Sequence, residues 1–331
     1  MTPTRVLLIG LGRWGAEHLR VLGELGAEVW VAEVDAGRRH AAVHGGLDPA
    51  RVVADFRAAL PHVTAADLVT PADSHRAIAE ECLRAGVDCF IEKPLALTAA
   101  DGEGIARAAA DAGRFVQVGH IFRFHAVTAV LRERVSALGP IRYATGRFAG
   151  FKRPRADVGV TQTDAIHLFD LFRYLLGRPA TAVTATLRDY LGRGMDDCAF
   201  ASVEYGDVTA FVEVGYFAPG TYRDCVIVGE AATLAADFAT AEVRVHANRH
   251  VRSGGGWQAP DGEMTSEKAH GPEPLRRELE LFLDAVHRRT PPPVDVHDGI
   301  EALRTVEAAR RSSDIGRRVA IDAVRAREGR R

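Results

Sequence analysis

Short apolar runs alternate with amphipathic segments through about the first 120 residues of the chain. The apolar runs are rich in Val, Ile and Leu and occupy residues 5–10, 28–33, 51–54, 66–70, 87–91 and 115–119. Between them lie segments with apolar residues at helical spacing, such as 74–85 and 99–112. Because strands that alternate with helices pair in parallel through right-handed crossovers, this half predicts a parallel sheet.

The pattern changes after residue 119. Longer strand-like segments follow one another closely at 181–190, 198–206, 208–217 and 223–230, with glycine, aspartate or proline at several of their joints. Such joints are typical of hairpins, so this half predicts a large, mostly antiparallel sheet. Helices are expected at 164–176, 273–289 and 298–313. The polar, glycine-rich stretch 247–272 predicts a mobile loop.

A glycine-rich turn follows the first predicted strand and opens a helical segment. Its sequence is Gly10-Leu11-Gly12-Arg13-Trp14-Gly15. In a dinucleotide fingerprint the first glycine permits the tight turn, the second lets the backbone approach a pyrophosphate, and the third lets the helix pack on the strand. Glu33 ends the second strand, 21 residues after Gly12. A carboxylate there accepts hydrogen bonds from the ribose of NAD and repels the 2′-phosphate of NADP, so we predict NAD.

These patterns together predict two domains, which fits a length of 331 residues. We expect residues 1–122 to form an NAD(P)-binding, doubly wound Rossmann domain, and residues 123–331 to form an α+β domain with a large open sheet that binds substrate. Within the fingerprint, Arg13 and Trp14 are candidate cofactor contacts. Asp35 is an alternative to Glu33 as the acidic residue that binds the ribose. The neighbouring cations Arg38 and Arg39 keep NADP open as an alternative cofactor.

Two more strand ends should contribute to the same crevice, because ligands bind at the carboxyl ends of the strands in such sheets. Thr70, Pro71 and His75 follow the fourth strand and are candidate cofactor contacts. Ser74 is expected to cap the next helix.

Glu92-Lys93-Pro94 follows the fifth strand. A residue before proline favours an extended backbone, so the Lys93 side chain should leave the strand end in a defined direction. Both Glu92 and Lys93 are candidate cofactor contacts, and Lys93 also a substrate contact. Taken alone, this tripeptide is typical of a surface turn, and the neighbouring strand ends favour the functional interpretation.

Composition excludes several classes of protein. A formal net charge of -2 with 26% charged residues indicates no general binder of nucleic acid. No apolar run reaches 18 residues and the N-terminus lacks a signal-peptide pattern, so we expect a cytoplasmic protein with no membrane partner. The four cysteines show neither CxxC spacing nor histidine partners, so we expect buried thiols and no metal site: Cys82, Cys89, Cys198 and Cys225.

These features, in this order, resemble one family. The fingerprint with its terminal acid, then TPADSH (70–75), EKPLALT (92–98), QVGHIFRF (117–124) and a helix with His167, is similar to the glucose-fructose oxidoreductase, inositol dehydrogenase and rhizopine-catabolism (Gfo/Idh/MocA) family. Residues 299–321 also resemble its C-terminal segment, so the resemblance covers nearly the whole chain. It implies an open antiparallel sheet in the second domain, with homodimers or homotetramers formed through the exposed face of that sheet.

Within the family, residues 151–170 are most similar to members that oxidise or reduce carbon 3 of a nucleotide-linked hexose. Those members carry an aspartate four residues before the histidine. Thr163 occupies that position here, and Asp164 lies three residues before His167. The resemblance implies Lys93, His167 and Asp164 as catalytic residues and Thr163 as a substrate contact.

Oxidation of a secondary alcohol sends a hydride to the nicotinamide and a proton to a base. A histidine accepts that proton near neutral pH, and a carboxylate on the same helical face, such as Asp164, stabilises the charged imidazole. We expect Thr163, Asp164, His167 and Asp170 to form such a polar stripe. Lys93 would donate a hydrogen bond to the reacting oxygen, and either Lys93 or His167 would carry the proton.

Lys152, Arg153 and Arg155 form a cationic loop that either grips the diphosphate of a nucleotide sugar or is simply solvated. His120 and Arg123 are further candidate substrate contacts. The function predicted is therefore NAD-dependent hydride transfer at a ring carbon of a nucleotide-linked hexose. One alternative is a dehydrogenase of free sugars, sugar phosphates or inositol, and another is a non-catalytic sensor of NAD or sugar.

Overall fold

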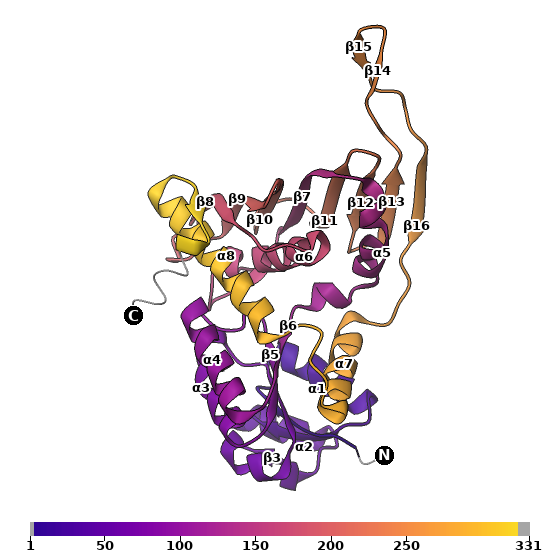
Figure 1. The fold of residues 1–331 in the computed structure, drawn as a ribbon. Coiled ribbons are helices and arrows are strands. Elements are labelled where there is room, and N and C mark those ends of the chain that lie inside the picture. Colours follow the sequence, from indigo (N-terminus) through magenta and orange to yellow (C-terminus); the bar gives the residue numbers. More distant parts are fainter. Residues whose placement is uncertain (1–2, 324–331) are drawn as a thin grey trace. The chain divides into compact units, whose positions relative to one another are not determined.

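The computed structural model describes residues 3–323, which form two compact units (Figure 1). The first unit runs to Ile121 and also includes Glu273–Leu303. The second contains Phe122–Pro272 and continues from Arg304. The segment 273–303, which the sequence analysis assigned to the second domain, therefore packs with the first. Helix α8 (Val296–Ile315) begins in the first unit and ends in the second.

In the described part of the first unit, six parallel strands form one sheet in the order β3-β2-β1-β4-β5-β6. These strands are β1 (Arg5–Ile9), β2 (Glu28–Ala32), β3 (Val52–Val53), β4 (Ala65–Leu68), β5 (Asp88–Glu92) and β6 (Val116–Gly119). The helices between them are α1 (Arg13–Glu24), α2 (Ala36–His44), α3 (Ala72–Arg84) and α4 (Ala99–Ala112). The doubly wound sheet predicted from the alternating pattern is confirmed. Its strand order reverses between β1 and β4, where such sheets bind ligands.

Helix α7 (Pro274–Arg288) joins the first unit because its apolar face completes that core. Leu275, Leu279 and Phe282 are buried in one cluster with residues of β1, α1 and β2. The ring of Phe282 meets Phe90 of β5 edge to face, with 5.7 Å between centroids. A helix far along the sequence therefore covers the sheet of the first unit.

In the described part of the second unit, nine strands form a sheet in the order β16-β13-β12-β11-β7-β10-β9-β8-β17. Strands β7 and β10 run parallel and the other neighbours run antiparallel, as the hairpin-like joints predicted. The strands are β7 (Ile141–Gly150), β8 (Ala182–Arg188), β9 (Cys198–Tyr205), β10 (Val208–Gly215), β11 (Thr221–Gly229), β12 (Thr233–Asp237), β13 (Glu242–His246), β16 (Met264–Lys268) and β17 (Val319–Ala320).

Helices α5 (Ala126–Arg134) and α6 (Ile166–Leu176) pack against this sheet (Figure 1). Gly146 of β7 makes the approach of α6 possible, because an added Cβ would lie only 3.0 Å from the Phe172 ring. In contrast, Tyr143, Phe200 and Phe211 of the sheet are large apolar side chains exposed to solvent. Among residues 3–323, no helix is long and apolar enough to cross a membrane.

The loop predicted at 247–272 is wrong for much of its length. Strands β14 (Val251–Ser253) and β15 (Gly256–Gln258) form a hairpin, and β16 extends the large sheet by pairing with β13. Gly254 and Gly255 take positive φ angles of 60° and 80°, which a tight hairpin turn requires. Because these strands are almost entirely exposed, they lack the apolar alternation that marks a strand in the sequence.

The contribution of α7 to the first unit is open to a direct test. Leu279→Ala removes a fully buried side chain from the shared core and should lower the free energy of unfolding by about 2–5 kcal/mol. Urea titration followed by circular dichroism measures this change. The control is Glu280→Ala on the exposed face of the same helix, which should change stability by less than about 1 kcal/mol. Equal effects of the two substitutions would contradict the assignment.

Candidate functional site

The three glycines of the fingerprint have different structural tasks. Gly10 has a φ of 96°, in the region that favours glycine. A Cβ on Gly15 would overlap the carbonyl oxygen of Gly10, so only glycine lets α1 approach β1 this closely. Around Gly12, in contrast, an added Cβ would meet nothing within 4 Å. Space therefore remains open at the start of α1.

The N-terminus of α1 is suited to a phosphate group. Gly12 is its N-cap residue, no side chain caps it, and its first turn carries no acidic residue. The first backbone N–H groups of a helix have no partner within the helix and attract anions. These residues fit the pyrophosphate of a dinucleotide.

Glu33 lies at the end of β2 and holds this turn in place. Its carboxylate accepts hydrogen bonds from the backbone N–H of Leu11 at 2.6 Å and of Asp35 at 2.9 Å, and Arg38 lies 3.5 Å away. Burial by itself raises the pKa of Glu33, but the two backbone donors and Arg38 outweigh it and hold the pKa below its usual value. Glu33 is therefore an ionised acceptor beside the glycine turn.

Asp35 has a different role from the one proposed as an alternative to Glu33. It is the N-cap of α2, and its side chain accepts a hydrogen bond from the backbone N–H of Arg38 at 2.8 Å. Arg39 donates hydrogen bonds to the backbone carbonyls of Glu33 and Val34. The carboxylate of Glu33 is thus the one turned toward the fingerprint.

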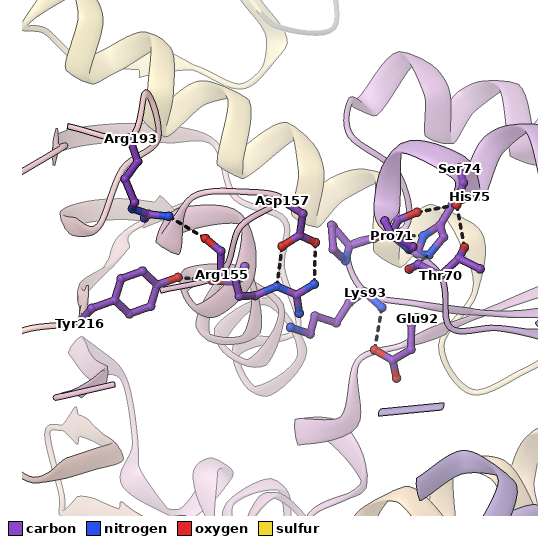
Figure 2. Close-up of polar contacts among 12 residues, drawn as sticks. Thr70, Pro71, Ser74, His75, Glu92, Lys93, Arg155, Asp157, Arg193 and Tyr216 are labelled. Carbon is purple, nitrogen blue, oxygen red and sulfur yellow. Dashed lines mark hydrogen bonds and ion pairs between the residues drawn. The ribbon is translucent and has the colours of Figure 1, made fainter. Parts of the chain in front are cut away.

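The turn after β4 is joined to the turn after β5 by a histidine. Buried His75 places Nε2 2.9 Å from the carbonyl oxygen of Thr70 and Nδ1 3.1 Å from that of Pro94 (Figure 2). Burial is the main cause that lowers the pKa of His75, and the contacts with the carbonyl oxygens of Thr70 and Pro94 act in the opposite direction. The expected cap by Ser74 is wrong: Pro71 is the N-cap of α3, and the Ser74 hydroxyl lies within the first turn, 2.7 Å from both the Pro71 carbonyl oxygen and Thr70 Oγ1.

Lys93 begins the turn after β5. Its backbone N–H donates a hydrogen bond to Glu92 Oε2 at 3.1 Å (Figure 2), and the peptide bond to Pro94 is cis. Glu92 is buried, whereas Lys93 is half-buried. Lys93 therefore lies at the carboxyl end of the fifth strand, as predicted.

In the second unit, His167 follows an irregular helical start. Residues Thr161–Ala165 are π-helical and α6 follows them directly. The spacing of three and four residues used to place Thr163 and Asp164 on one stripe with His167 applies to α-helices and does not hold across this segment. Ile166, Phe169 and Phe172 are buried in the core of the second unit.

Asp164 and Thr163 each bind a side chain from a strand or loop of the same unit. Asp164 Oδ2 accepts a hydrogen bond from Lys152 Nζ at 2.7 Å, and both side chains are largely covered. Thr163 Oγ1 lies 3.3 Å from the hydroxyl of Tyr216. The ammonium of Lys152 also lies 5.5 Å from the centre of the Tyr216 ring. These four residues form one polar cluster around the π-helical segment.

The imidazole of His167 lies among aromatic rings. Phe148 stacks on it at 5.6 Å with an interplanar angle of 15°, and Phe122 is tilted against it at 4.9 Å. The side chain is 5% exposed, so few orientations are open to it. The aromatic rings around His167 and the polar cluster on the preceding turn are compatible with a role of His167 as a base that contacts the apolar face of a sugar.

Two of the remaining predicted substrate contacts, Arg123 and Arg155, are paired with carboxylates within their own unit. Arg123 is buried in an ion pair with Asp170, which takes Asp170 out of the expected stripe. Arg155 is paired through two hydrogen bonds with Asp157, at 2.8 and 2.6 Å (Figure 2). Arg153 is exposed, and His120 is buried at the end of the first unit.

Sequence reasoning missed two residues that shape the start of α6. Asp196 Oδ2 accepts hydrogen bonds from both the backbone N–H and the hydroxyl of Thr161, each at 2.6 Å. Gly159 makes room for it, because a Cβ there would overlap the Asp196 carboxylate. Tyr216 was the other omission. Neither stands near His167 in the sequence, so spacing alone carried no signal for them.

The roles of Glu33 and Asp35 can be separated by mutation. Glu33→Gln removes the ionised acceptor beside the glycine turn and should weaken NAD⁺ binding by roughly tenfold, about 1.4 kcal/mol. Asp35→Asn should leave binding nearly unchanged, because asparagine also caps a helix. Calorimetric titration with NAD⁺ and NADP⁺ measures both. A larger loss in Asp35→Asn than in Glu33→Gln would overturn this assignment.

Family models match most of the chain. Residues 4–120 match the NAD-binding Rossmann fold of the Gfo/Idh/MocA oxidoreductase family, and residues 133–321 match its C-terminal alpha/beta domain. Inositol 2-dehydrogenase 1 of Saccharopolyspora erythraea is 29% identical, with 96% of each chain covered. UDP-N-acetylglucosamine 3-dehydrogenase of Acidithiobacillus ferrooxidans is 32% identical, with 56% of this chain and 58% of that protein covered.

Solved structures share the fold over nearly the full length. An oxidoreductase from Agrobacterium radiobacter, in complex with NAD+, L-tartaric acid and magnesium, has a TM-score of 0.83 at 20% identity and covers 98% of this chain and 100% of its own. Levoglucosan dehydrogenase in complex with NADH has a TM-score of 0.83 at 20% identity, with 97% and 99% covered. With both family models matched and a fingerprint that fits a dinucleotide, the chain belongs to the Gfo/Idh/MocA family of NAD-binding oxidoreductases.

Proposed function

We propose that this protein transfers a hydride between NAD and a ring CH–OH group of a sugar or cyclitol. The observation that carries the proposal is Lys93, a cation at the carboxyl end of β5 in the sheet that bears the dinucleotide fingerprint. NAD, when bound, supplies the hydride acceptor or donor. Gly10, Gly12, Gly15 and Glu33 would hold it, together with the neighbouring residues Arg13, Trp14, Thr70, Pro71, His75 and Glu92.

The proton is handled by residues of the chain. Lys93 donates a hydrogen bond to the substrate oxygen and stabilises negative charge that develops there. His167, held between aromatic rings, takes the proton from the hydroxyl during oxidation and returns it during reduction. Asp164, whose carboxylate is oriented by Lys152 on the π-helical segment before α6, is the acid that we propose supports the charged imidazole.

Two classes of substrate fit this chemistry, and different observations favour each. The similarity to UDP-N-acetylglucosamine 3-dehydrogenase and the exposed Arg153 favour carbon 3 of a nucleotide-linked hexose. The similarity to inositol 2-dehydrogenase over 96% of the chain favours a free cyclitol or sugar. So does the pairing of Lys152 and Arg155 with carboxylates, since it satisfies two of the three cations expected to grip a diphosphate.

Reduction of NAD⁺ followed at 340 nm tests the proposal with UDP- and TDP-hexoses, inositols and free sugars. We expect turnover with one of these groups. Lys93→Met and His167→Gln should each lower kcat by about 10²–10⁴-fold, because each removes a group that handles charge or protons in the transition state. Both variants should keep the NAD⁺ affinity of the unmodified protein.

The matched control is Lys268→Met, which removes a lysine from an exposed edge strand of the second unit. It should retain full activity. Absence of turnover with every substrate in the panel, or full activity in Lys93→Met, would refute the proposed reaction. Activity confined to nucleotide-linked sugars, and reduced by Arg153→Ala, would select the first substrate class.

We also propose that the protein forms a homodimer or homotetramer through the open face of its nine-stranded sheet. Phe200 and Phe211 lie on adjacent strands there and are 54% and 50% exposed. They line a groove with Thr145, Thr184, Ser202 and Val226. Exposed apolar surface of this kind is typical of an interface.

The oligomer is tested by sedimentation velocity. Phe200→Asp with Phe211→Asp places two charges on the apolar face and should shift the protein toward the monomer. Leu191→Asp, an exposed apolar residue outside this groove, should leave the assembly unchanged. A monomeric unmodified protein would contradict the proposal.

A further inference from the structure

Three ionisable side chains are buried together directly behind the Lys93 turn. His18 comes from α1, Asp67 from β4 and Glu92 from β5, and the three are 0%, 0% and 6% exposed. His18 Nδ1 lies 2.8 Å from Asp67 Oδ2, and its Nε2 lies 3.4 Å from Glu92 Oε1. The mechanism proposed above uses neither His18 nor Asp67.

The proton content of this cluster follows from its geometry. An imidazole between two buried carboxylates is stabilised in its charged form, because an unpaired buried carboxylate is costly. Burial by itself lowers the pKa of His18, but Asp67 and Glu92 outweigh it and raise the pKa to about 10. Burial raises the pKa of Asp67. Burial also acts to raise the pKa of Glu92, but the hydrogen bond and charge of His18, together with Lys93 and Trp14, outweigh it and lower that pKa. These directions favour a charged His18 beside a Glu92 carboxylate that bears a negative charge.

That charge acts on Lys93. Glu92 Oε2 accepts the backbone N–H of Lys93 at 3.1 Å, and the side-chain charge of Lys93 is a further cause that lowers the pKa of Glu92. Coulomb attraction acts on both partners, so ionised Glu92 favours the ammonium form of Lys93. Glu92 also acts on Asp67 and on His75 of α3, and the rings of Trp14 and Phe90, which are uncharged, flank His18.

The backbone leaves room for this arrangement. Gly119 of β6 pairs with Glu92 in the sheet, and a Cβ added to it would lie 2.8 Å from Glu92 Oε1. A larger residue at this position would push the carboxylate away from His18.

We propose that His18 and Asp67 are positioning residues for Lys93. They keep Glu92 ionised and in one orientation, and Glu92 then holds the backbone of Lys93 and keeps its side chain charged. Lys93 is therefore a permanent hydrogen-bond donor near neutral pH and not the base. The inference deepens the proposed role of Lys93, but its test needs no substrate.

The chain contains only three lysines, Lys93, Lys152 and Lys268, so ¹³C-lysine labelling of the full chain gives three side-chain signals that Lys→Arg variants assign. Glu92→Gln should lower the pH at which Lys93 titrates by about one unit, a tenfold change in proton affinity. His18→Gln should shift it in the same direction, because Glu92 without its partner takes up a proton. The double variant should shift less than the sum of the two, as expected for residues that act through one another.

Two controls accompany this measurement. Lys268 should titrate identically in every variant, and Glu17→Gln, an exposed carboxylate on the same helix, should leave Lys93 unchanged. Thermal unfolding and NAD⁺ affinity report whether each variant is folded. If His18→Gln does not fold, Gly119→Ala displaces the carboxylate from the opposite side and should produce the same downward shift.

An unchanged titration of Lys93 in Glu92→Gln would overturn the proposal, as would strictly additive effects of His18→Gln and Glu92→Gln. If the protein oxidised no sugar, the proposed function would be refuted. The expected changes in the titration of Lys93 would not be affected by that result. The two hypotheses therefore fail separately.

Discussion

The close approach of helix α1 to strand β1 is the constraint on which the first unit depends. A side chain on Gly15 would overlap the carbonyl oxygen of Gly10, so the contact exists only because position 15 is glycine. It places the start of α1 where no side chain caps the helix and where the backbone N–H of Leu11 donates a hydrogen bond to Glu33. One turn further on, the same approach brings His18 to Asp67 and Glu92.

A different constraint organises the second unit. The residues that precede His167 are all buried and several are polar, so each must find a partner. Asp164 binds Lys152, Thr163 lies against Tyr216 and Thr161 binds Asp196. These partners come from distant points in the sequence and hold a π-helical turn that isolated residues would not form. Asp164 lies within this turn.

Much of the fold could be predicted because local patterns repeat the periods of strands and helices. The apolar runs at 5–10, 28–33 and 87–91 correspond closely to buried parallel strands. Prediction failed where the local signal was weak or misleading. The exposed strands at 251–268 have no apolar alternation, and helix α7 joins the first unit through a core cluster whose members, such as Leu8 and Leu279, lie some 270 positions apart in the sequence.

The sequence by itself determined the chemistry available to this protein: a glycine turn with a terminal acid, a lysine at a strand end and a histidine on a helix. Each of these signals lies within a short stretch of residues, so it can be recognised in the sequence without knowledge of the tertiary structure. Only the tertiary structure decided which charged groups are paired with one another. It assigned Asp35 to a helix cap, paired Arg123, Lys152 and Arg155 with carboxylates, and buried His18 between two acids. Charge pairing depends on distance and burial, and neither exists until strands and helices far apart in the chain have packed together.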